Sequence, residues 1–175
     1  MPTIFNILTH PHKNLRIRAQ EVDLGYLKTD ECKTFLKNFT HTMRVKDGVG
    51  LAAVQVDTPK RIICIIRDVL SKEERAALGL GRHDDLILVN PEWFPLSQKK
   101  AWGQEGCLSV PGLWGDVERT ADIQVTALNK HGERLAFKAT DFFSRVIQHE
   151  VDHNNGILFI DKAHNLTKNT NGIKA

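Results

Sequence analysis

The chain has little of what marks a membrane or secreted protein. None of its apolar runs approaches the ~20 residues that a membrane-spanning helix needs. Residues 1–6 (MPTIFN) have neither the charged start nor the apolar segment of a signal peptide. Three cysteines in 175 residues are too few for a disulfide framework. We therefore expect a cytoplasmic prokaryotic protein with no membrane partner.

An excess of one charge is also missing. The 24 Lys and Arg residues against 21 Asp and Glu residues leave a formal charge of +3, with neither a dense basic patch nor aromatic platforms. We expect no direct nucleic-acid binding. The sequence also lacks repeats and Pro/Ser-rich linkers, and it is long enough to bury one hydrophobic core. It predicts a single domain over residues 1–164 and a short polar tail over residues 165–175.

Hydrophobic spacing and turn residues predict the elements. Apolar residues recurring every three to four positions predict a helix over residues 29–46. A second helix is predicted over residues 140–155, capped by Thr140 or Asp141 and ended by Gly156. Residues 71–85 predict a helical turn and a loop. β-Branched or alternating runs predict strands at residues 61–68, 86–90 (stopped by Pro91), 121–128, 133–139 and 156–161.

The order of these elements predicts the fold class. Strands cluster before a late helix and do not alternate regularly with helices, which is typical of an α+β fold. We expect antiparallel or mixed sheets packed around a central helix, the one over residues 140–155.

That late helix carries the pattern H-E-x-x-H at residues 149–153. Residues four apart point to nearly the same side of a helix, so His149 and His153 can bind one metal ion. Glu150 is rotated by ~100° around the axis, where a general base would flank the ion without binding it. The preceding residues 142–147 are mostly apolar, and burying this polar group beside them would be costly without a ligand.

Two histidines leave a catalytic metal one protein ligand short. Downstream, Asp161 and His164 follow a predicted strand end. Upstream, Cys107 lies in a turn-rich stretch from which its thiol can project into a site. Cys64, within an apolar run, and Cys32, on the first helix, instead suit buried structural positions.

Residues 48–55 (GVGLAAVQ) combine small side chains with one amide. Small residues let an extended peptide approach the backbone closely, and Gln55 can donate to a carbonyl oxygen. Taken alone, the run is better explained by tight backbone packing. It is not a dinucleotide fingerprint, because the third glycine and the strand-to-helix context are missing.

Three segments together resemble the signature motifs of the peptide deformylase family, in the family's order: GVGLAAVQ (48–55), EGCLS (105–109) and QHEVDH (148–153). The resemblance extends from about residue 7 to residue 161. It implies an enzyme that hydrolyses the N-formyl group from the formylmethionine of nascent polypeptides and releases formate.

The resemblance also implies roles for individual residues. It implies that Cys107, His149 and His153 bind the metal and that Glu150 is the catalytic acid/base. The implied ion is Fe²⁺, with Zn²⁺, Ni²⁺ or Co²⁺ as replacements. The other implied contacts are with substrate: the Gln55 side chain and the Leu108 N–H stabilise the oxyanion, Val49 and Gly50 pair with the extended peptide, and Val146 lines the methionine pocket.

Some positions depart from the family pattern or extend it. Asn154 stands where the family usually has Leu, and Trp114 lies near where substrate enters in relatives, so it can contact the peptide or pack on the surface. Glu105 and Arg119 are expected to pair and brace the Cys107 loop. Some relatives dock on the ribosome through a basic C-terminal helix. Transient ribosome contact therefore stays open, although residues 165–172 are poor helix formers.

Two other functions are compatible with the same motifs. One is a different metallopeptidase or amidase with an H-E-x-x-H helix, which an assay with formylated and unformylated peptides would distinguish. The other is a non-catalytic metal-binding protein, which would need the metal but not Glu150.

Overall fold

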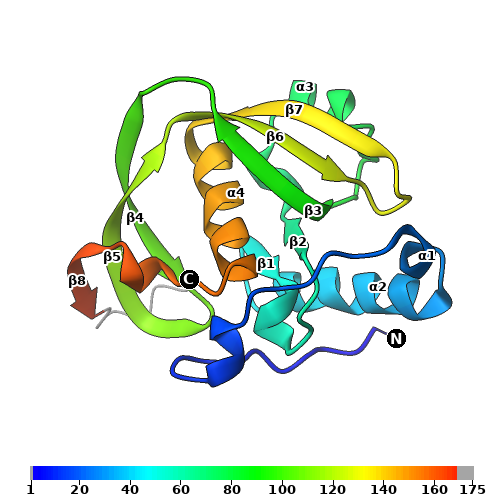
Figure 1. Cartoon of the computed structure of the whole chain (residues 1–175), viewed down its shortest axis with the longest axis horizontal. Coiled ribbons are helices and arrows are strands. Elements are labelled where there is room, and N and C mark those ends of the chain that lie inside the picture. Colours follow the sequence, from blue (N-terminus) through cyan, green and yellow to red (C-terminus); the bar gives the residue numbers. More distant parts are fainter. Residues whose placement is uncertain (1, 169–175) are drawn as a thin grey trace.

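The fold, given by a computed structural model that describes residues 2–168, has two antiparallel sheets with a helix between them (Figure 1). The larger sheet has the order β1-β2-β3-β6-β7, with β1 (Gly50–Ala52), β2 (Ile62–Ile65), β3 (Leu86–Pro95), β6 (Asp122–Leu128) and β7 (Arg134–Thr140). The smaller has the order β4-β5-β8, with β4 (Lys100–Cys107), β5 (Val110–Thr120) and β8 (His164–Lys168). The predicted α+β class with antiparallel sheets is confirmed.

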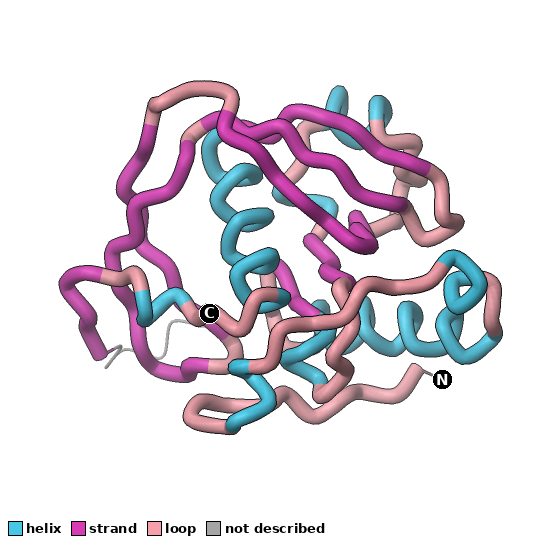
Figure 2. Tube along the Cα trace, viewed as in Figure 1, coloured by secondary structure: helices cyan, strands magenta, loops and turns pink. Residues whose placement is uncertain are grey.

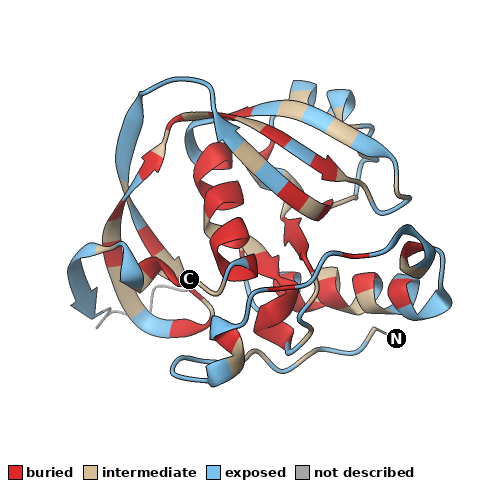
Figure 3. Ribbon diagram, viewed as in Figure 1, coloured by how far each residue is buried: buried red, intermediate tan, exposed pale blue. Residues whose placement is uncertain are grey.

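Helix α4 (Asp141–Asn154) lies between the sheets, and most of its length is buried (Figure 3). Its apolar face packs into the main core against residues of β2, β3 and β6. Gly156 follows the helix with φ 73° and provides the left-handed turn predicted there. Thr140 is the N-cap residue, one of the two predicted caps, although its side chain accepts no hydrogen bond, and Asp141 is the first helical residue.

The other helices cover the edges of this core. They are α1 (Leu24–Leu27), α2 (Asp30–Val45) and α3 (Lys72–Ala77), with short 3₁₀ turns η1 (Lys13–Arg16), η2 (Ala53–Val56), η3 (Arg67–Val69) and η4 (Phe159–Asp161). Helix α2 confirms the prediction for residues 29–46: the Thr29 side chain accepts a hydrogen bond from the Cys32 N–H, and Phe39 and Met43 are fully buried. No helix within residues 2–168 is long and apolar enough to cross a bilayer.

The N-terminal segment before α1 is mostly loop, and Figure 2 shows it running past the lower end of α4. It is hydrogen-bonded to two of the motif segments and to the residue that directly follows the third. The Leu8 N–H donates to the Gln55 carbonyl at 2.8 Å, the His10 N–H to the Ser109 carbonyl at 2.7 Å, and the Ala19 N–H to the Asn154 carbonyl at 2.8 Å. This loop therefore ties the three motif segments together by their backbones.

The prediction that Pro91 stops a strand is wrong. Strand β3 continues to Pro95, and its register with β6 shifts between Val89 and Glu92. Asn90 has φ 50° at this bulge. A bulge leaves a residue outside the ladder, so the missing N–H of Pro91 breaks no inter-strand hydrogen bond.

The strand predicted over residues 156–161 is also wrong. Leu158 and Phe159 are buried in a small core with Leu15 and Val117, but their backbone turns into η4. The Asp161 carboxylate accepts from the Leu158 N–H at 2.9 Å, and the Asp161 N–H donates back to the Leu158 carbonyl. The apolar run is buried by packing alone, which sequence periodicity does not separate from strand pairing.

Strand β8 pairs with β5 and includes residues 165–168 of the predicted tail. Residues 169–175 lie outside the described residues. The boundary between domain and tail therefore stays a prediction.

Candidate active site

Cys107, His149 and His153 come together at one buried point. Each offers one ligand atom, and these atoms all lie within 4.8 Å of one another. The Cys107 Sγ is 3.3 Å from the His153 Nε2, and the two imidazole centroids are 5.0 Å apart. One thiol and two imidazoles at this spacing can bind a single ion, whereas Cys32 and Cys64 are buried elsewhere, in the core beside α2.

The thiol is presented by the bend between β4 and β5. The register of these strands shifts between Gly106 and Cys107, which frees the chain to turn. The Ser109 N–H donates to the Cys107 Sγ at 3.4 Å, and the Gln55 amide donates to it at 3.5 Å. These two donors hold the sulfur in place at the bend.

Glu105 orients His149. The His149 Nδ1 lies 2.8 Å from the Glu105 Oε2, so Nδ1 is the nitrogen that carries the proton shared with the carboxylate and Nε2 is left for a ligand. Burial lowers the pKa of His149, but hydrogen bonds with Cys107 and Glu105 outweigh it and raise the pKa well above its usual value. The negative charges that favour a proton on this imidazole also favour a metal cation beside it.

Glu105 is itself held by arginine. Arg119 donates to both of its carboxylate oxygens at 2.9 Å, and Arg119 also pairs with Asp152. Burial opposes ionisation, yet the hydrogen bonds from Arg119 and His149 hold the pKa of Glu105 well below its usual value. The predicted pairing of Glu105 with Arg119 is confirmed, and each partner is about 95% buried.

Glu150 lies beside the three ligands. It is 4% exposed, and its Oε2 has no hydrogen-bond partner within residues 2–168. Burial raises its pKa to about 7, which suits a group that both takes and returns a proton near neutral pH. A Cβ at Gly50 would collide with the Glu150 carboxylate, so only glycine allows this approach.

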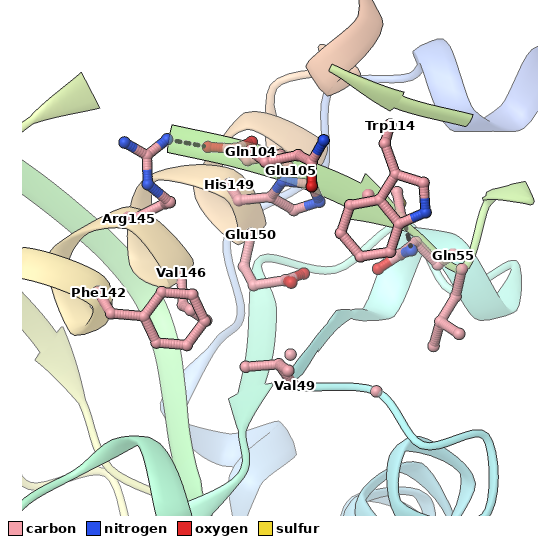
Figure 4. Close-up of a pocket in the computed structure, with 15 residues that line it drawn as sticks. Val49, Gln55, Gln104, Glu105, Trp114, Phe142, Arg145, Val146, His149 and Glu150 are labelled. Atoms are coloured by element: carbon pink, nitrogen blue, oxygen red, sulfur yellow. Dashed lines mark hydrogen bonds and ion pairs between the residues drawn. The ribbon is translucent and has the colours of Figure 1, made fainter. Parts of the chain in front are cut away.

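A cavity of about 150 Å³ opens onto this group, and Figure 4 shows Val49, Gln55, Trp114, Val146 and Glu150 around it. Its lining includes all the predicted site residues except His153. Trp114 also lines the cavity, and its contact with the peptide stays a prediction. The lining comprises Gly48, Val49, Gly50, Gln55, Gln104, Glu105, Gly106, Cys107, Leu108, Trp114, Phe142, Arg145, Val146, His149 and Glu150.

Gln55 and Leu108 both present N–H groups near the thiol. The Gln55 Oε1 accepts from the Ala52 N–H at 2.8 Å, which orients the amide so that its NH₂ points to Cys107 and Ser109. The Leu108 N–H has no acceptor within residues 2–168. Two such donors can stabilise negative charge on a substrate oxygen.

Sequence reasoning missed three lining residues: Gln104, Phe142 and Arg145. Phe142 and Arg145 precede His149 by seven and four residues, so they share its side of the helix, and this spacing was the signal that could have identified them. Strand β4, which supplies Gln104, was not predicted at all.

Two imidazoles, a thiol and an unpaired buried carboxylate form the donor set and base of a metallohydrolase. Comparison with known proteins makes this more specific. The sequence pattern of the polypeptide deformylase family matches residues 4–169. Peptide deformylases from Desulforudis audaxviator and Wolinella succinogenes are 37% and 40% identical to the chain, over 94% and 89% of its length and 97% and 86% of theirs.

Solved structures agree. A Met-Ala-Ser-bound crystal structure of a class I type b peptide deformylase from Acinetobacter baumannii superposes with a TM-score of 0.81 and 32% identity, covering 93% of this chain and 99% of that one. The Thermotoga maritima peptide deformylase gives a TM-score of 0.78. The chain belongs to the polypeptide deformylase family. Its activity is hydrolysis of the N-formyl group from formylmethionine of nascent polypeptides.

Proposed function

We propose that Cys107, His149 and His153 bind the catalytic metal, natively Fe²⁺, and that Glu150 is the acid/base of deformylation. The observation that carries this proposal is the convergence of the three ligand atoms within 4.8 Å beside an unpaired buried carboxylate. A thiolate and two imidazoles suit Fe²⁺, Zn²⁺, Ni²⁺ and Co²⁺ alike. The last three ions can therefore replace Fe²⁺ at this site. When bound, such an ion supplies Lewis acidity that activates a water and polarises a carbonyl group.

The residues around the ion divide the remaining work. Glu150 takes a proton from the attacking water and delivers it to the leaving amine, because its raised pKa allows both transfers near neutral pH. The Gln55 amide and the Leu108 N–H donate to the oxyanion that develops on the formyl oxygen. Removing one such donor typically costs on the order of 10²–10³ in rate.

Substrate is held by backbone and by apolar contact. Strand β1 is an edge strand, and its Gly50 and the preceding Val49 line the cavity, so these two residues can pair with an extended peptide. The methionine side chain enters the apolar part of the cavity, against Val146. Trp114, whose ring lies against Gly106, contacts the residues that follow methionine.

The wider setting follows from this activity. We propose one catalytic domain over residues 1–164 with a polar tail over residues 165–175, acting in the cytoplasm on formylmethionine peptides. Any ribosome contact is transient, and residues 164–168 form strand β8. Direct nucleic-acid binding and membrane association are not part of the proposal.

The test combines substrate choice with metal content. Anaerobically purified protein is assayed on a formyl-Met peptide and on its unformylated twin, and the same sample is analysed for metal. We expect formate from the first peptide only and about one ion per chain. Glu150→Gln should keep the metal and lose activity by on the order of 10²–10⁴. Retained activity in this variant would remove Glu150 from the mechanism, and cleavage of the unformylated peptide would identify a peptidase.

A further inference from the structure

Arg145 is a buried arginine on α4, one helical turn before His149. Its guanidinium donates to the Glu105 carboxylate at 2.8 Å. It also donates to the Val117 carbonyl at 2.9 Å and the Ala101 carbonyl at 2.7 Å. The side chain thereby joins the helix that carries the histidines to both strands of the hairpin that carries the cysteine.

The backbone of β4 is shaped to receive this group. A Cβ built at Gly103 would lie 2.8 Å from the Arg145 Cζ, closer than real Cβ atoms come to other heavy atoms. Any other residue at position 103 would displace the guanidinium. Gly103 and Arg145 therefore fit each other as a pair.

The same carboxylate that binds Arg145 orients a metal ligand. The Glu105 Oε1 accepts from Arg145 and Arg119, and its Oε2 accepts from Arg119 and from the His149 Nδ1. All four acceptor positions of Glu105 are occupied, which fixes the plane of the carboxylate. Arg119 comes from β5, whereas Arg145 and His149 share one helix, so Arg145 fixes the carboxylate relative to that helix turn.

Arg145 also lines the cavity beside Val146 and Phe142. Its charged end is bound to β4 and Glu105, so its aliphatic stem is the part available to form the wall, as long basic side chains often do. One residue therefore takes part in both the metal site and the substrate pocket.

We propose that Arg145 is a positioning residue: it holds Glu105 against His149 and thereby sets the geometry of the Cys107, His149 and His153 metal site. This inference rests on the metal site proposed above. Partners that orient metal-ligating histidines typically account for 10–100-fold in metal affinity. We expect a loss in this range when the guanidinium is removed.

The experiment separates the guanidinium from the stem. Arg145→Met keeps an unbranched stem, and Arg145→Lys keeps the charge without the planar fork. The matched control is Arg44→Met, which removes a guanidinium from the nearly buried Asp85 carboxylate, away from the metal site. Each protein is stripped of metal, its Zn²⁺ dissociation constant is measured by chelator competition, and its Co²⁺ absorption spectrum is recorded.

We expect Arg145→Met to bind Zn²⁺ 10–100-fold more weakly and to show an altered Co²⁺ spectrum. Arg145→Lys should fall between Arg145→Met and wild type, and Arg44→Met should match wild type. Wild-type affinity and spectrum in Arg145→Met would overturn the inference. If wild type itself binds no Zn²⁺, the proposed metal site fails instead.

A second variant covers the case in which Arg145→Met does not fold. Gly103→Ala leaves Arg145 in the chain but fills the space of its guanidinium. It should weaken Zn²⁺ binding in the same direction. Unchanged Zn²⁺ affinity in folded Gly103→Ala would equally contradict the inference.

Discussion

Asn154, the last residue of α4, is fully buried, and neither its Oδ1 nor its Nδ2 has a hydrogen-bond partner within residues 2–168. Leu has the same branched shape and the same number of side-chain heavy atoms, without the polar atoms. We therefore expect Asn154→Leu to stabilise the protein. The Asn154 carbonyl, which accepts from the Ala19 N–H, is unaffected by the substitution.

The size of the effect follows from desolvation. A buried polar group without a partner costs about 1–3 kcal/mol, so removing it should raise the free energy of unfolding by about 2 kcal/mol. In a domain of this size, 1 kcal/mol shifts Tm by about 2–4 °C. The variant should therefore melt about 4–8 °C higher than wild type.

Thermal and urea unfolding at matched metal content would measure this. Asn155→Leu is the matched control, because Asn155 is exposed and its Oδ1 accepts from Arg61 at 2.9 Å, so its loss should not stabilise. A folded Asn154→Leu protein with unchanged or lower Tm would refute the reasoning. Such a result would mean that the Asn154 side-chain amide has a hydrogen-bond partner in solution.

Three further outcomes are expected. Gly50→Ala should lower kcat by about 10² or more without loss of metal, because the added methyl group displaces the Glu150 carboxylate and a general base contributes about 10²–10⁴ in rate. An unchanged kcat would argue against that collision. Gln55→Leu should lower kcat/KM by about 10²–10³, whereas a change in KM alone would assign Gln55 to substrate binding. The hydrogen bond from Arg16 holds the pKa of Asp161 below its usual value. The Arg16–Asp161 pair therefore stabilises the fold above about pH 4, and this stabilisation is lost as pH falls through the lowered pKa. The difference in unfolding free energy between wild type and Asp161→Asn should therefore shrink on acidification, and a constant difference would exclude the ion pair as its source.

The sequence predicted local features well where periodicity and turn chemistry act over short distances. The helix over residues 29–46 and the hairpin over 121–139 are confirmed because each has its own amphipathic pattern and its own turn. The two histidines of the candidate metal site could also be identified from the sequence, since H-E-x-x-H places two imidazoles on one side of a helix whatever the tertiary structure.

The parts that sequence reasoning missed depend on contacts between distant segments. Strand β4 carries Gly, Gln and charged residues without clear alternation, and pairing with β5 makes it a strand. In the sequence, nothing distinguishes Arg145 from an ordinary helix residue. Its partners Ala101 and Glu105 come into contact with it only in the folded protein. Long-range pairing of this kind leaves no local signal.

The free edge of β1 has a consequence for the range of proteins the enzyme can serve. Main-chain N–H and C=O groups are common to every polypeptide, so a strand edge can bind a chain without reading its sequence. In the binding mode proposed above, the apolar part of the cavity beside Val146 is the part that selects, and it selects one side chain. In the proposed binding mode, the acceptance of many different polypeptides therefore comes from one short stretch of backbone.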